Sequence, residues 1–322
     1  RMRDLIAERK NNLQSSIIPS GHIFAKRAAG AALTLPAYRD EQWHGRTQLR
    51  FVQQQSNEFD ASKQNLREKL AQLKAIIFNK NNLTINITAE ADGVKLVEEH
   101  IDRLLEKLPA GHRAKRTSQP SLAPVYAGIA VPTQVSYVAR AMKAPAYKDP
   151  SSALLMLASR ELSNSYLYKY IRVQGGAYGG MSSFDATQGI FAFLSYRDPH
   201  IAETLNIFQE AQKFYSQNDM NADDLEKAII STLSALDKPL DPSGRGYVAM
   251  IRHFAGATDP MRQSFRDQIF AATPRKVRET LSEYFEKAAQ FGAVAVYSAQ
   301  EKLDAANKLL TIKLNLEKLS EI

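Results

Sequence analysis

The sequence predicts an α+β protein in which long helices cover a sheet. The first eighty residues carry apolar residues at helical spacing and few turn residues. After residue 120, short apolar runs of strand length alternate with longer segments that open with Asp-Pro or Thr-Pro. With 322 residues and 44% hydrophobic content, the chain is long enough for two domains of ordinary size.

The N-terminal part is predicted to be a helix-rich layer followed by one strand and one helix. Apolar residues at steps of four, three and four form a single helical stripe at Leu66, Leu70, Leu73 and Ile77. Leu83–Thr88 alternates apolar and polar residues, as a half-buried strand does. The following helix has one apolar face, made by Val97, Ile101, Leu104 and Leu108.

A linker is expected after this helix. Residues 109–123 have no apolar period and contain two prolines and one glycine. We therefore divide the chain into residues 1–116 and 117–322.

The second part opens with two apolar runs, Val125–Val131 and Val135–Ala141, which predict neighbouring strands. Asp149-Pro150 predicts the start of a helix that runs to about Arg172, and Ile190–Tyr196 predicts another strand. Four later helix starts are marked by Asp198-Pro199, Asn221, Asp259-Pro260 and Thr273-Pro274. A last strand, Ala293–Tyr297, precedes a final helix. This order favours a sheet covered by helices on one face.

Composition excludes several function classes. The chain has no cysteine, so it has no thiolate nucleophile and no Cys-ligated zinc, and a reducing compartment is permitted. The net charge of +8 is spread among acidic residues, and its densest basic run, His112–Arg116, lies in the linker. Without a base-stacking or groove-reading motif we expect no nucleic-acid partner. No apolar window approaches the roughly 18 residues of a membrane span, so we expect no membrane partner.

The segment Tyr170–Gly180 is the most informative, because a helix ends there in a loop with four glycines around Tyr178. Such a loop can offer peptide groups, a phenol and the Arg172 guanidinium to one ligand. It can equally be a glycine helix cap with Tyr178 filling a gap in the core. A phosphate-binding loop fits less well, because the glycines follow a helix instead of preceding one.

Two stretches, Arg172–Gly180 and Ile190–Pro199, resemble the C-terminal domain of presequence proteases and falcilysin, in the pitrilysin (insulinase) family of zinc metallopeptidases. That domain carries an Arg, five intervening residues and then Tyr within Gly-Gly-Ala-Tyr-Gly-Gly. The resemblance covers residues 117 to about 300, and the earlier segments resemble the preceding family domain. It implies two family-like domains, each a mainly antiparallel sheet covered by helices, preceded by a helix-rich segment.

The resemblance also implies an enzyme of two similar halves in which the N-terminal half binds zinc through an inverted H-x-x-E-H helix. None of the six histidines here fits that pattern. The nearest segment, His200–Thr204, ends in Thr where the second ligand would stand. We therefore expect no metal site in this chain and zinc only in the full-length enzyme.

Carried over by position, Arg172 and Tyr178 are the candidate catalytic residues. Tyr178 would donate to the oxyanion that forms on the scissile carbonyl, and Arg172 would hold substrate main-chain carbonyls. The candidate substrate-binding residues are Arg172, Gly175, Gly176, Ala177, Tyr178 and Gly179.

The sequence thus predicts the C-terminal, non-metal-binding half of a zinc metalloendopeptidase that degrades short unstructured peptides, such as targeting peptides. Its partners would be the peptide substrate and the zinc-bearing N-terminal half, and the chain alone would be inactive. The alternative is a stand-alone inactive partner subunit or a peptide-binding module of the same family. The expected location is the bacterial cytoplasm, with the mitochondrial or plastid matrix as the alternative.

Overall fold

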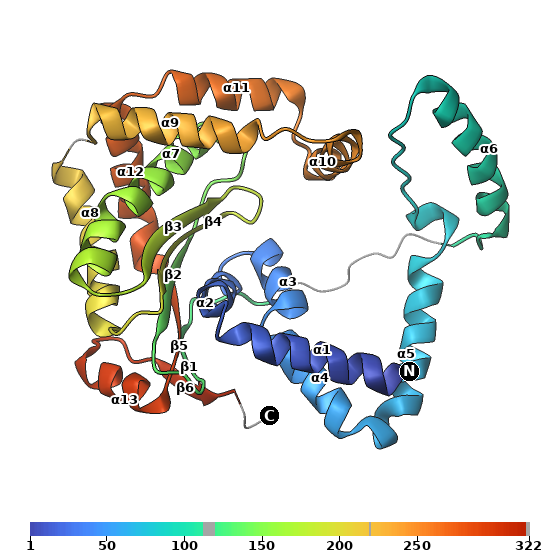
Figure 1. The fold of residues 1–322 in the computed structure, drawn as a ribbon, viewed down its shortest axis with the longest axis horizontal. Helices are drawn as coiled ribbons and strands as arrows, with labels where there is room; N and C mark the ends of the chain where they lie inside the picture. The colour runs from blue at the N-terminus through green and yellow to red at the C-terminus, as the bar shows by residue number, and fades with distance from the viewer. Residues whose placement is uncertain (112–119, 219, 320–322) are drawn as a thin grey trace. The chain divides into compact units, whose positions relative to one another are not determined.

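A computed structural model describes residues 1–111, 120–218 and 220–319 (Figure 1). The chain forms two compact units. Unit 1 comprises Arg1–Ser56, Pro120–Asp237 and Asp259–Ile322, and unit 2 comprises Asn57–Gln119 and Lys238–Thr258. The boundary expected between residues 116 and 117, and the basic run at 112–116, lie outside the described residues. The assignment of 1–116 and 117–322 to successive family domains stays a prediction.

Unit 1 is built on one six-stranded sheet with the strand order β3-β4-β2-β5-β1-β6. Its strands are β1 (Tyr126–Ala130), β2 (Tyr137–Lys143), β3 (Gly179–Asp185), β4 (Ile190–Tyr196), β5 (Ala293–Ser298) and β6 (Asn315–Lys318). The pairs β3·β4, β4·β2 and β2·β5 are antiparallel, whereas β1 pairs in parallel with β5 and β6. The predicted α+β class and mainly antiparallel sheet are confirmed, but the described residues contain one such sheet instead of one in each of two domains.

The expectation that β1 and β2 are neighbours is wrong, because β5 lies between them. Every residue of β5 is buried. A strand this apolar is most stable in the centre of a sheet, where both of its edges are paired and both of its faces are covered. The sequence separation between β5 and its two neighbours hides this pairing from local patterns.

Helices cover both faces of the sheet, so the expectation of a single covered face is also wrong. Because successive side chains alternate between faces, Val138 and Met142 of β2 join one core, and Tyr137, Ala139 and Ala141 join the other. The N-terminal helices pack against the second core through residues such as Leu13, Phe24, Ala29, Leu49 and Val52. In Figure 1, α7, α8 and α12 lie on one side of the sheet and α2 on the other.

Unit 1 contains ten α-helices within its described residues. They are α1 (Met2–Ile17), α2 (Gly21–Gly30), α3 (Leu35–His44), α4 (Arg46–Asn57), α7 (Ser152–Asn164), α8 (Ala202–Gln217), α9 (Ala222–Leu236), α11 (Asp259–Phe270), α12 (Pro274–Ala288) and α13 (Gln300–Leu309). The predicted starts at Asn221, Asp259-Pro260 and Thr273-Pro274 are confirmed. The starts predicted at Asp149-Pro150 and Asp198-Pro199 are early, because α7 and α8 begin at Ser152 and Ala202. The Asn221 side chain accepts a hydrogen bond from the Asp223 amide at 2.9 Å, as an N-cap does.

Unit 2 contains α5 (Phe59–Ile77), α6 (Ala91–Lys107) and α10 (Pro242–Ala255). The predicted strand Leu83–Thr88 is wrong, because the described residues of unit 2 contain no strand to pair with it. The Asn86 amide instead donates to the Gly246 carbonyl in α10, at 3.0 Å. The stripe on α5 lies on a helix, as predicted, but no residue of α5 is buried. Among the helices of the described chain, none combines the length and the apolar composition that a membrane crossing requires.

Candidate functional site

The candidate site lies where the main helix of the sheet domain ends. After α7 the chain turns at Ser165 and continues as a π-helix, η2 (Tyr168–Gln174), which carries Arg172. A π-helix is wider than an α-helix and is frequent at functional sites. The single long helix predicted up to Arg172 is therefore interrupted, although its extent is as expected.

Two glycines explain the close packing at this helix end. Gly176 has φ +74°, a left-handed conformation that favours glycine, and ends the helix. A Cβ on Gly180 would lie 2.7 Å from both the Ile171 Cβ and the Leu167 carbonyl oxygen. Only glycine therefore lets β3 start directly against η2.

The glycine loop itself offers few free amides. The N–H groups of Gly176 and Ala177 donate to the Arg172 and Ile171 carbonyls at 3.1 Å, and the Ala177 side chain is buried. Gly179 pairs with Tyr196 across the β3·β4 ladder. Gly175, beside them, is half-buried. The binding roles of these four residues stay predictions, and the motif also exposes the side chains of Arg172 and Tyr178.

Arg172 and Tyr178 lie together and face solvent. The Arg172 guanidinium carbon is 5.5 Å from the ring centroids of both Tyr168 and Tyr178, within cation–π range. The Tyr178 side chain is 63% exposed. Tyr178 therefore does not fill a gap in the core, and that interpretation of the glycine loop is wrong.

An aromatic row continues from Tyr178 across the sheet edge. Its ring lies 5.7 Å from Tyr196 in an edge-to-face arrangement, and Tyr196 lies 4.8 Å from His22 of α2 and 5.7 Å from Tyr137 of β2. The Arg197 guanidinium lies over the Tyr196 ring at 5.4 Å. At the site two adjacent rings, Tyr178 and Tyr196, are thus flanked by two guanidinium groups, Arg172 at one end and Arg197 at the other.

Burial shifts the pKa values of Tyr137 and His22 at the inner end of this row. The pKa of Tyr137 is raised, first by burial and then by Tyr196, while Arg197 opposes the rise through its charge and a hydrogen bond. The Tyr137 hydroxyl donates to the Ile18 carbonyl. Burial lowers the pKa of His22, which favours its neutral form. The row is therefore neutral inside and positively charged at its two ends.

The chain shows no metal site in its described part. No group of three or more His, Asp or Glu side chains there could hold an ion. His200 and Glu203 are both exposed and 3.9 Å apart, while Thr204 is buried and donates to Asp198 at 2.7 Å. The segment His200–Thr204 therefore forms a polar helix start, and zinc does not fit it.

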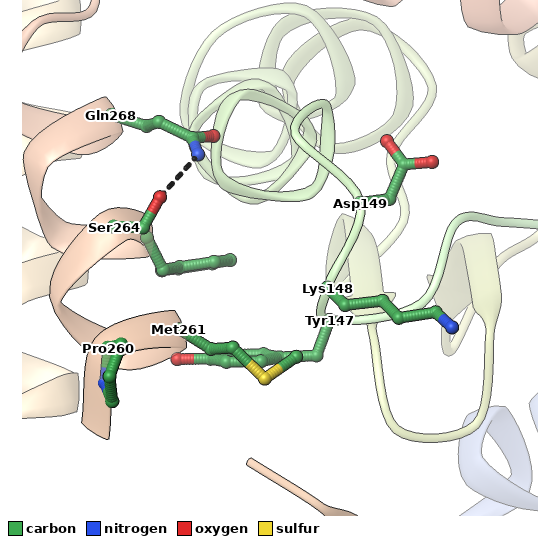
Figure 2. Close-up of a pocket in the computed structure, with 8 residues that line it drawn as sticks. Tyr147, Lys148, Asp149, Pro260, Met261, Ser264 and Gln268 are labelled. Atoms are coloured by element: carbon green, nitrogen blue, oxygen red, sulfur yellow. Dashed lines mark hydrogen bonds between the residues drawn. The ribbon is translucent and has the colours of Figure 1, made fainter. Parts of the chain in front are cut away.

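A separate pocket of about 260 Å³ lies between the loop before α7 and helix α11 (Figure 2). The stacked rings of Tyr147 and Phe265, with centroids 4.8 Å apart, line it. Asp149 accepts a hydrogen bond from the Ser151 amide at 2.9 Å in the turn before α7, and Figure 2 shows Lys148 pointing away from α11. The pocket is lined by both apolar and polar side chains and is separate from the glycine loop.

Sequence reasoning missed Tyr168, Tyr196, Arg197 and His22 as parts of the site. Both Tyr196 and Arg197 lie in the resembling stretch, but the sequence predicts Tyr196 only as the end of a strand and predicts no role for Arg197. Tyr168 lies four residues before Arg172, which is one turn of helix. His22 had no sequence signal, because only the tertiary packing of α2 brings it to the sheet.

The comparison with known families decides the relationship of this chain. Residues 127–296, which include the whole site except its α2 contribution, match the model of the PreP C-terminal domain. The chain belongs to the PreP C-terminal domain family. Residues 1–54 match a second model, the domain associated with subfamily C of the M16 peptidases. The predicted relationship to presequence proteases is confirmed.

Curated relatives agree with the PreP assignment. The chain is 28% identical over 310 residues to presequence protease 1, chloroplastic/mitochondrial, of Arabidopsis thaliana, and 30% identical over 282 residues to the mitochondrial presequence protease of Saccharomyces cerevisiae. These matches cover 95% and 84% of this chain but 28% of each relative. The chain thus spans between a quarter and a third of the length of these PreP relatives.

Among solved structures, the chain is similar to the peptidase M16 inactive domain from Pseudomonas fluorescens, with 17% identity and a TM-score of 0.49. The match covers 73% of this chain and 53% of that one. The PreP assignment rests on the sequence matches and does not need this similarity.

Proposed function

We propose that this chain is the C-terminal, non-metal-binding half of a zinc metalloendopeptidase that degrades short unstructured peptides. Its membership of the PreP C-terminal domain family and the names of its relatives support this role. The observation that carries the proposal is the exposed pair of Arg172 and Tyr178, stacked at 5.5 Å at the start of β3. In the described part of the chain, no hydrogen bond or ion pair engages the Tyr178 hydroxyl or the Arg172 guanidinium.

These two side chains suit the hydrolysis of a peptide bond. When water adds to the scissile carbonyl, negative charge develops on its oxygen, and a positioned phenol donor stabilises that charge more than it stabilises the ground state. A guanidinium donates in a fixed fork and can hold main-chain carbonyls of the peptide. The zinc, held by the N-terminal half, would supply the activated water, because this chain has no fitting ligand set in its described residues.

The cellular location follows the relatives. The Arabidopsis relative is designated chloroplastic/mitochondrial and the yeast relative mitochondrial. These designations support the mitochondrial or plastid matrix as the location, in preference to the bacterial cytoplasm. Targeting peptides are a fitting substrate class in either organelle, since their removal leaves short unstructured fragments.

The proposal is tested on the full-length protein that carries this chain. It should contain one zinc by metal analysis and cleave an unstructured peptide of about 20 to 40 residues, whereas this chain alone should do neither. Arg172→Ala should lower cleavage, and the control Arg160→Ala, at an exposed position on α7, should not. Stoichiometric zinc in the isolated chain, or no peptide cleavage by the zinc-loaded full-length protein, would contradict the proposal.

A further inference from the structure

One irregularity at the site has no counterpart elsewhere in the described chain. Arg197 has φ +50° and is the only non-glycine residue there with a positive φ. A left-handed conformation is unfavourable for a long side chain, and residues held in such conformations cluster at functional sites. The pairing between β2 and β4 around Arg197 imposes this left-handed conformation.

Arg197 occupies a β-bulge. Ala139 of β2 pairs with Leu194 of β4, so three residues further along in this antiparallel register Ser136 would oppose Arg197. Ser136 instead pairs with Asp198, through two backbone hydrogen bonds of 2.7 and 2.8 Å. The strand therefore carries one extra residue here, in the left-handed position that glycine usually takes in a bulge.

The bulge changes the face on which Arg197 lies. Strand alternation places Phe193 in one core and Leu194 in the other, so an unbulged strand would put Arg197 on the face of Phe193. The Arg197 guanidinium instead lies 5.4 Å over the ring of Tyr196, on the opposite face. The bulge thus turns a charged side chain onto the surface that carries the aromatic row.

The other edge of β4, which pairs with β3, keeps a regular register beside Arg197. Gly179 pairs with Tyr196, and the next amide, that of Tyr178, donates to the Arg197 carbonyl at 3.4 Å. Arg197 thus contacts Tyr178 through its backbone carbonyl and the ring of Tyr196 through its side chain. Tyr178 and Tyr196 in turn lie 5.7 Å apart.

The Arg197 guanidinium has donors left for a ligand beside its hydrogen bond with Tyr137. The Arg197 side chain is exposed, and no carboxylate forms an ion pair with it or with Arg172 within residues 1–111, 120–218 and 220–319. Two guanidinium groups therefore bracket Tyr178 and Tyr196 without a counter-charge. Such an arrangement favours oxygen acceptors, either carbonyls or carboxylates, and disfavours cationic groups.

We propose that Arg197 is a second substrate-binding arginine of this site, which holds a main-chain oxygen of the peptide beside the one held at Arg172 and Tyr178. This rests on the proposed function. The bulge places the Arg197 guanidinium beside the Tyr196 ring. The unfavourable left-handed conformation is retained because the positive charge binds the substrate. The oxygen belongs either to an internal carbonyl or to the C-terminal carboxylate of a short peptide.

The test replaces Arg197 with residues that suit the bulge. Glycine and asparagine both tolerate positive φ, so Arg197→Gly and Arg197→Asn should leave the Tm of this chain unchanged or raise it by about 2 °C. In the full-length protein, both should lower kcat/KM for an unstructured peptide by at least about 10-fold, mainly through KM. The matched control is Arg160→Gly, which also removes an exposed guanidinium but lies in α7, outside the site. It should lower the Tm, because glycine is unfavourable within a helix, and leave KM unchanged.

Two peptide forms identify the oxygen. An equal loss with acetylated, amidated peptide and with free-acid peptide assigns Arg197 to an internal carbonyl, and a loss confined to the free acid assigns it to the terminal carboxylate. Unchanged KM in both Arg197 variants, while Arg172→Ala and Tyr178→Phe impair cleavage, would overturn this inference alone. Unimpaired cleavage in all four variants would overturn the proposed function as well.

Discussion

Two tyrosines of unit 1, Tyr178 and Tyr215, have opposite surroundings. Tyr178 follows η2, is 63% exposed, and has no hydrogen-bond partner for its hydroxyl within the described chain. Tyr215 of α8 is 2% exposed, and its hydroxyl donates to the buried carboxylate of Glu161 and lies 3.1 Å from the Ser165 hydroxyl. One phenol is thus free for a ligand, and the other is committed to the core.

The two environments predict different roles for the two hydroxyl groups. Burial raises the pKa of Tyr215 far above its ordinary value, and the neighbouring Glu161 raises it further, so this hydroxyl stays protonated and fixed. The Tyr178 ring instead lies beside the Arg172 guanidinium, at the surface. Removing the hydroxyl from each tyrosine should therefore produce opposite effects, on activity in one case and on stability in the other.

The largest effect is expected from Tyr178→Phe in the full-length protein. Loss of one oxyanion donor typically lowers turnover by about 10²- to 10³-fold. KM should change little, because the hydroxyl acts where charge develops. The free energy of unfolding should stay within about 0.5 kcal/mol, since the side chain is exposed. Steady-state kinetics and urea denaturation measure the two quantities, and full retention of activity would show that the phenol has no role in catalysis.

A smaller effect on activity is expected from Arg172→Ala. The change removes a charged donor, and such hydrogen bonds contribute about 1.5–3 kcal/mol, which corresponds to roughly 10- to 100-fold in kcat/KM. Because a main-chain clamp acts in both ground and transition states, kcat and KM should both worsen. Arg172→Lys tests geometry and should recover only part of the loss. A full recovery by lysine would mean that positive charge alone is sufficient.

Tyr215→Phe should act on stability instead. It deprives the buried Glu161 carboxylate of a donor, so the free energy of unfolding should fall by about 1–3 kcal/mol. The kinetic constants of the full-length protein should be unchanged at a temperature where the variant is folded. A loss of turnover equal to that of Tyr178→Phe would break the distinction between the two tyrosines.

The smallest effect concerns pH. Burial raises the pKa of Glu161 above its ordinary value of 4.5, and Asp224 raises it further, although Ser165 and Tyr215 donate to the carboxylate. Because the folded state then binds the proton more tightly than the unfolded state, stability falls as pH rises from about 4.5 through the raised pKa. Glu161→Gln should remove this part of the slope. Urea denaturation between pH 4.5 and 8 compares the variants, and an unchanged slope would exclude Glu161 as its source.

The sequence predicted well those features that local chemistry determines. Helix starts at Asn221, Asp259-Pro260 and Thr273-Pro274 were correct, because an N-cap side chain or proline acts within one turn. The same signal, Asp241-Pro242, also opens α10. The glycine motif led to the candidate site, and the structure brings Arg172 and Tyr178 together there.

Features that depend on distant contacts were not predicted. Leu83–Thr88 and β4 both show apolar residues at strand-like positions, but only β4 has partners on both edges. The insertion of β5 between β1 and β2 joins residues more than 150 positions apart, which no local period reveals. The bulge at Arg197 depends on the register between β2 and β4, so its side chain direction follows from tertiary pairing alone.

The central claim is that this chain contributes Tyr178 to a reaction whose metal lies in another half. It is tested most directly by adding this chain to a separately produced zinc-bearing N-terminal half and measuring peptide cleavage. The wild-type chain should bind and restore activity, and the Tyr178→Phe chain should bind equally well but restore about 10²-fold less. Equal restoration by both chains, or no binding between folded halves in sedimentation, would contradict the account.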